Sequence, residues 1–210
     1  MKCKLFFGAG LGALSLAALL LNAAPAVAQE QLPREEALKY AFAVAANLGE
    51  MLKTPVPTDP DIKRPVALRE GDYGGMVLPE AKLAAVALQK PGTEGIPVGQ
   101  LWLLKLVPMK DGQPVPAGSL RFVDVTSEEG SAQVLCCVLM VRSTGGEGRE
   151  LVVLGKDKTP LLTAPLKSIT KTQHNPIEMT AERKEDGGLI TLRLLGKYEA
   201  SFMVTDPDQF

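Results

Sequence analysis

The stretch Ile190–Val204 reads Ile-Thr-Leu-Arg-Leu-Leu-Gly-Lys-Tyr-Glu-Ala-Ser-Phe-Met-Val. Its even-numbered positions hold no charged residue, and its odd-numbered positions hold most of the polar and charged ones. Because successive side chains of a strand point to opposite faces, this alternation is typical of a strand with one dry face. A two-residue hairpin at Gly196-Lys197 would invert the alternation, and no inversion is seen. We therefore expect either one long strand bent at Gly196 or a hairpin whose loop has an odd length.

The sequence before this stretch continues the β pattern back to Pro97. Apolar runs are separated by turn sequences such as Asp111-Gly112, Glu128-Glu129-Gly130 and Gly145-Gly146-Glu147-Gly148, and no helical period intervenes. The runs are Val98–Val107, Leu120–Val125, Val134–Val141, Leu151–Leu154, Leu161–Leu166 and Ile177–Ala181. The pattern predicts a mainly β protein, an antiparallel β-sandwich or barrel, over residues 76–210.

Residues 29–53 are predicted to form one amphipathic N-terminal α-helix, starting near residue 33. Pro33 suits a first helical turn, and the acidic Glu35 and Glu36 complement the positive end of the helix dipole. The helix should end at Lys53-Thr54-Pro55. Its apolar residues recur at three- and four-residue spacing and form a stripe that needs cover, which we expect the same chain to supply. The predicted stripe consists of Leu38, Ala41, Phe42, Ala45, Leu48 and Leu52.

Residues 54–75 are predicted to be a linker that crosses the surface of the domain. This segment holds four prolines and ends at Gly74-Gly75. Proline at this density favours an extended chain with few hydrogen bonds. The next segment, Pro79–Lys90, fits either a short helix or a strand.

Residues 1–28 are predicted to be a cleavable signal peptide. Lys2 and Lys4 precede a mostly apolar stretch, and Ala26-Val27-Ala28 supplies the small residues that a signal peptidase reads. Cleavage would leave Gln29 as the first residue of an exported protein, either periplasmic or extracellular. The alternative is an uncleaved membrane anchor, since about 20 apolar residues can span a bilayer. We expect no other membrane span.

The charge balance argues against nucleic acid as a partner. The chain has 23 basic and 24 acidic side chains, and the predicted signal peptide removes two lysines and no acid. The mature protein is therefore slightly acidic and has no electrostatic attraction to phosphate backbones or anionic lipid.

The sequence contains no catalytic constellation that we can recognise. Its one histidine, His174, stands beside Asn175-Pro176 in a polar stretch between two expected strands. Any Ser-His-Asp or Cys-His arrangement would have to use it. Carboxylates occur in turn-like pairs, namely Asp59 with Asp61, Glu128 with Glu129 and Asp206 with Asp208. A glycosidase needs two carboxylates at a set separation across a cleft, which such pairs do not establish.

Cys136 and Cys137 are the two cysteines that follow the predicted signal peptide. They are adjacent inside an apolar run, so on a strand their side chains leave opposite faces. This geometry opposes a disulfide between them and a shared metal site. We expect both to be buried, reduced and poorly reactive, and we expect no metal or other cofactor.

Tyr73 is the one residue that the sequence suggests as a ligand contact. It lies in the glycine-rich segment Glu70-Gly71-Asp72-Tyr73-Gly74-Gly75, and a tyrosine can both stack on a ligand and form hydrogen bonds with it. With no catalytic residues assigned, the leading hypothesis is an exported, non-catalytic β-domain that binds a protein or small ligand or serves in a cell-envelope assembly. The alternatives are a periplasmic or secreted hydrolase that uses paired carboxylates and a thiol or metal protein that uses Cys136 and Cys137.

Overall fold

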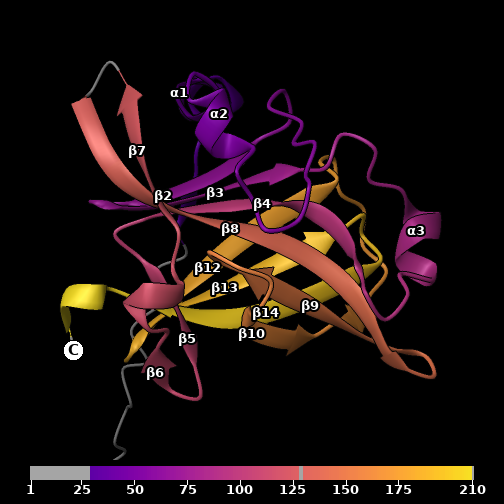
Figure 1. Cartoon of the computed structure of the whole chain (residues 1–210). Coiled ribbons are helices and arrows are strands. Elements are labelled where there is room, and N and C mark those ends of the chain that lie inside the picture. The colour runs from indigo at the N-terminus through magenta and orange to yellow at the C-terminus, as the bar shows by residue number, and fades with distance from the viewer. Residues whose placement is uncertain (1–28, 128–129, 210) are drawn as a thin grey trace, which may run out of the picture.

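The computed structural model describes residues 29–127 and 130–209. Within these residues, two antiparallel sheets pack face to face and the helices are short (Figure 1). The predicted mainly β, sandwich-like fold is confirmed. The predicted signal peptide, residues 1–28, lies outside the described residues, as do Glu128 and Glu129 of one predicted turn.

The first sheet has eight strands in the described part of the chain. Its longest strand is β8, which pairs with β4 on one side. On its other side β8 pairs with β7 along its N-terminal half and with β9 along its C-terminal half. The order is β1 (Glu30–Gln31), β2 (Val66–Glu70), β3 (Tyr73–Pro79), β4 (Ile96–Leu104), β8 (Gly130–Gly145), β9 (Gly148–Leu154) and β10 (Pro160–Pro165), with β7 (Phe122–Ser127) beside β8.

The second sheet has six strands among the described residues. Its order is β12 (Ile177–Lys184), β13 (Gly187–Leu194), β14 (Tyr198–Thr205), β5 (Val107–Lys110) and β6 (Gln113–Pro114), with β11 (Lys167–Ser168) paired to β14. The main core fills the space between the sheets, because the inward-facing residues of both sheets belong to one cluster of buried side chains. The outer face of β12–β14 is polar, as the alternation in the sequence predicts.

The stretch Ile190–Val204 forms a hairpin with a three-residue loop, which is the odd-length alternative. Leu194 lies opposite Tyr198, so the uncharged positions of both strands face the core together. Leu195 and Gly196 in the loop have φ values of 52° and 64°. A side chain at Gly196 would also collide with the carbonyl oxygen of Lys171, so only glycine fits there.

The predicted strand Val98–Val107 is divided between the two sheets. β4 ends at Leu104, Lys105 has a φ of 55°, and β5 begins at Val107 in the other sheet. The positive φ turns the chain out of the extended direction. One apolar run therefore supplies core residues to both sheets.

The expected N-terminal helix is interrupted, and its buried face differs from the predicted stripe. The chain forms α1 (Arg34–Ala45) and α2 (Leu48–Met51) with a turn between them. The buried residues are Ala37, Ala41, Val44 and Met51, whereas Phe42 and Leu52 are 55% and 49% exposed. The reason is that α1 is apolar or small on several sides, so spacing alone does not select a face. The small side chains lie against the sheet because they allow the closest approach of helix to strands.

The segment predicted as a linker, residues 54–75, includes strand residues in its second part. Residues 54–65 are mostly irregular, but Val66–Glu70 forms β2 and Tyr73–Pro79 forms β3. The two strands pair as a hairpin, so Gly74 and Gly75 are sheet residues. The ambiguous segment contains a short helix, α3 (Ala85–Gln89). Two short 3-10 helices lie at Ala117–Ser119 and Pro207–Gln209. Within the described residues, every helix is too short or too polar to cross a membrane.

Candidate functional site

An apolar groove of about 250 Å3 lies between α1 and the outer face of the first sheet. Its lining comes from α1, β2, β3, β4 and the β7–β8 hairpin, which rises beside α1 in Figure 1. Large apolar side chains form one part of the wall, namely Met76, Trp102, Leu104, Val125 and Val134. Small residues leave the open space, namely Ala43, Ala67, Gly74, Ser127, Gly130, Ser131 and Ala132.

Gly74 shows how the space arises. It is an outward-facing strand residue, and a Cβ atom added there would meet Leu104 Cβ at 3.6 Å, an ordinary contact distance. The backbone could therefore carry a side chain at this position, and the groove exists partly because it does not. The sequence signal for this open space is the Gly74-Gly75 pair, at the end of the predicted linker.

A buried polar network supports the wall of the groove. Trp102 Nε1 donates to Gln100 Oε1 over 3.1 Å. Gln100 Nε2 donates in turn to the carbonyl oxygen of Met51 at 3.0 Å and to Thr58 Oγ1 at 2.8 Å. Gln100 is fully buried, so these bonds satisfy an amide that water does not reach. The network ties β4 to α2 and to the irregular segment, and it fixes the Trp102 ring.

Among the described residues that line the groove, Arg69 is the one that carries a charge. Its Nη1 donates to the Tyr40 hydroxyl over 3.0 Å, and its Nε donates to the carbonyl oxygen of Gly71 over 3.1 Å. The Arg69 guanidinium therefore already donates to two acceptors of the protein itself.

Tyr73 lies outside the lining of the groove. Its hydroxyl donates to Asp206 Oδ2 at 2.6 Å, which joins the start of β3 to the C-terminal segment. This hydrogen bond raises the pKa of Tyr73 and lowers that of Asp206. The structure places Tyr73 in an intramolecular contact, and its role in ligand binding stays a prediction.

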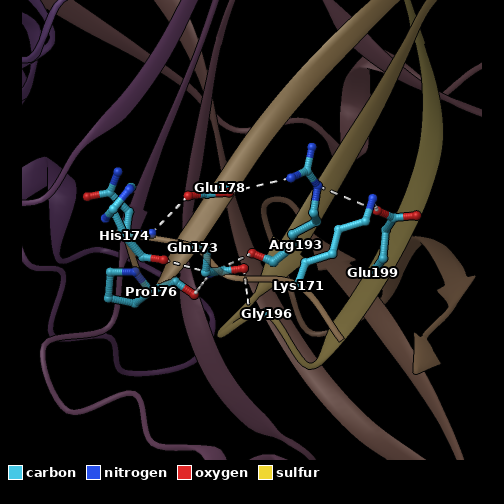
Figure 2. Close-up of polar contacts among 9 residues, drawn as sticks. Lys171, Gln173, His174, Pro176, Glu178, Arg193, Gly196 and Glu199 are labelled. Atoms are coloured by element: carbon cyan, nitrogen blue, oxygen red, sulfur yellow. Dashed lines mark hydrogen bonds and ion pairs between the residues drawn. The ribbon is translucent and has the colours of Figure 1, made fainter. Parts of the chain in front are cut away.

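His174 is exposed and lies beside a half-buried cluster of polar contacts on the second sheet (Figure 2). Its backbone N–H donates to Glu178 Oε1 at 3.0 Å. Arg193 lies between Glu178 and Glu199 at 3.5 Å from each, and these ion pairs connect neighbouring strands. The side chain of Gln173, beside His174, accepts from the Gly196 backbone N–H at 2.5 Å. These contacts hold the loop before β12 to the β13–β14 hairpin.

Cys136 and Cys137 are both buried and unbonded to each other, as expected. Cys137 faces the core between the sheets, whereas Cys136 faces the cluster beneath α1. Burial raises the pKa of both thiols, that of Cys136 to about 12. No group of three or more metal-ligating side chains occurs among the described residues.

A second hollow of about 420 Å3 lies elsewhere on the sandwich and shares no lining residue with the groove. It is bordered by the β5–β6 hairpin, β10 and β14, and two carboxylates from different turns, Asp111 and Asp186, line it. The sequence did not pair these residues, because 75 positions separate them in the chain. Both are exposed to solvent.

The fold and the groove define a two-sheet antiparallel β-sandwich with an apolar groove between its N-terminal helix and one sheet. No protein-family model, curated protein or solved structure matches the chain.

Proposed function

We propose that this is an exported, non-catalytic binding protein whose groove beneath α1 holds a small, uncharged, apolar ligand. The observation that carries the proposal is the groove itself, which small residues from distant segments leave open against an apolar wall. Its volume is somewhat below the range of about 300–1,000 Å3 that is usual for ligand pockets, which favours a small ligand.

The lining favours an uncharged ligand. Most of the wall is apolar, and hydroxyl groups of Tyr40, Ser127 and Ser131 lie among the lining residues. Arg69 already donates to Tyr40 and Gly71. A charged ligand would lose its hydration without gaining a dedicated partner of opposite charge.

The protein contains one tryptophan, and it lines the groove, so its fluorescence reports occupancy. Titration with octanol should shift Trp102 emission and saturate. Gly74→Phe should weaken binding at least about tenfold, because the ring occupies the groove and the backbone accepts a side chain there. Thr180→Phe, on the exposed face of β12, is the matched control and should bind octanol normally.

Unchanged binding in Gly74→Phe, with the melting temperature preserved, would contradict the proposal. So would octanol that leaves Trp102 emission unaltered in the unsubstituted protein.

The alternative hydrolase would work in the hollow that Asp111 and Asp186 border. A catalytic pair of carboxylates needs one member held protonated by a desolvating environment. Both aspartates are exposed, so their surroundings do not supply this desolvation. The geometry therefore supports binding better than hydrolysis.

A further inference from the structure

Gln29 lies at an edge where the two sheets come together. The next two residues form β1, which pairs with β2 at the end of the first sheet. The backbone N–H of Gln29 donates to the carbonyl oxygen of Ala181 at 3.4 Å, and Ala181 belongs to β12 at the end of the second sheet. The start of the described chain therefore bonds to both sheets.

The side chain of Gln29 strengthens this connection. Its Nε2 donates to Glu70 Oε2 at 3.2 Å, and Glu70 Oε1 also lies 3.5 Å from Arg183 Nη1. Glu70 is on β2 and Arg183 is on β12, so one carboxylate meets both sheets and Gln29. Gln29 is half-buried in this arrangement.

We propose that removal of residues 1–28 creates a docked N-terminus, in which the new α-ammonium of Gln29 donates to the Ala181 carbonyl oxygen while the Gln29 side-chain amide donates to the Glu70 carboxylate. The inference rests on the proposed export and cleavage. Hydrolysis of the Ala28–Gln29 peptide bond consumes water and leaves a carboxylate on the removed peptide and a protonated amine on Gln29. A neutral N–H donor becomes a charged one, and charge-assisted hydrogen bonds are the stronger kind. Cleavage thereby tightens the closure of this edge of the sandwich.

The test compares the chain that begins at Gln29 with the same chain carrying one extra glycine before Gln29. The added residue removes the charge from the docking position and keeps the N–H. It should lower the melting temperature by about 2–4 °C, the shift expected of a modest stabilising interaction in a chain of this length. When Glu70→Gln is introduced into both chains, most of the difference in melting temperature between them should disappear. Arg183→Gln, introduced in the same way, should preserve the difference.

Equal melting temperatures for the two chains would overturn the proposal. A difference that persists in Glu70→Gln would overturn it as well, because the carboxylate would then have no part in docking. Neither readout involves the groove or octanol, so failure here is distinguishable from failure of the proposed binding function.

A second measurement applies where Glu70→Gln folds poorly. An N-terminal glutamine can cyclise: the α-amine attacks the side-chain Cδ, a C–N bond forms and ammonia leaves. Docking holds the side-chain amide on Glu70 and the α-amine on the Ala181 carbonyl oxygen, so the folded protein should cyclise at least about tenfold more slowly than the urea-unfolded chain. Loss of ammonia is followed by mass spectrometry, and equal rates in the two states would contradict docking.

Discussion

Cys136 and Cys137 are neighbours in β8, yet they belong to different clusters of buried side chains. The two side chains point to opposite faces because side chains alternate along a strand. This could be predicted from two adjacent cysteines inside an apolar run. Their burial could be predicted as well, because Val134–Val141 is an unbroken apolar run and such runs are typical of strands covered on both faces. What could not be predicted is the neighbourhood of Cys136, where Arg121 slightly opposes the effect of burial on the pKa of the thiol.

The raised pKa of Cys136 predicts a loss of stability at alkaline pH. Burial moves this pKa from 9.0 to about 12 in the folded protein. Between these values the unfolded chain loses the proton and the folded chain keeps it, so the free energy of unfolding falls by about 1.4 kcal/mol per pH unit from this group. The Cys136→Ala variant lacks this thiol. The difference in free energy of unfolding between wild type and the variant should therefore become smaller as the pH rises from about 8 to about 10.

Urea denaturation under reducing conditions measures this effect. Val138→Ala is the control, since Val138 is equally buried on the same face of β8 and does not titrate. The cost of Val138→Ala should stay constant over the same pH range. A constant cost for Cys136→Ala would show that the folded thiol titrates normally.

At the scale of the element, helical periodicity does not predict which face of α1 is buried. The predicted stripe included Phe42 and omitted Val44, whereas the structure buries Val44 and exposes Phe42. Helical spacing is satisfied by both sets, because Ala37, Ala41 and Val44 also recur every three or four residues. The choice between them depends on the surface that α1 meets, which lies in strands far along the chain.

The two faces of α1 are distinguished by a pair of substitutions. Val44→Glu should reduce the free energy of unfolding by at least about 2 kcal/mol, because it places a charge against the sheet. Phe42→Glu should cost less than about 1 kcal/mol, because this side chain is largely exposed. Both values come from urea denaturation. The reverse order of effects would restore the stripe that the sequence suggested.

At the scale of the whole molecule, the chain closes one edge of the sandwich with residues that directly follow the predicted cleavage site. Gln29 contacts β12, and β1 extends the first sheet by two residues. A fold that uses Gln29 in this way is compatible with a mature chain that starts there. The identity of the mature N-terminus stays a prediction.

Mass spectrometry of the protein recovered after export, together with N-terminal sequencing, should find Gln29 as the first residue. The reason is the Ala26-Val27-Ala28 site that ends the apolar leader. A protein retained in the membrane fraction with residues 1–28 intact would show that the leader is an anchor. The groove experiment would still apply to such a protein, since every lining residue follows residue 28.

The sequence by itself determined most of the strands that follow Pro97, several of the turns between them and the faces of residues within each strand. These properties depend on the two-residue repeat of strand side chains and on turn residues, which are neighbours in the chain. Only the tertiary structure decided that Gly74 belongs to a sheet, that Val44 is buried and that a groove lies beneath α1. The groove is open because small residues from α1, β2, β3 and the β7–β8 hairpin meet there, and strand pairing between distant segments brings them together.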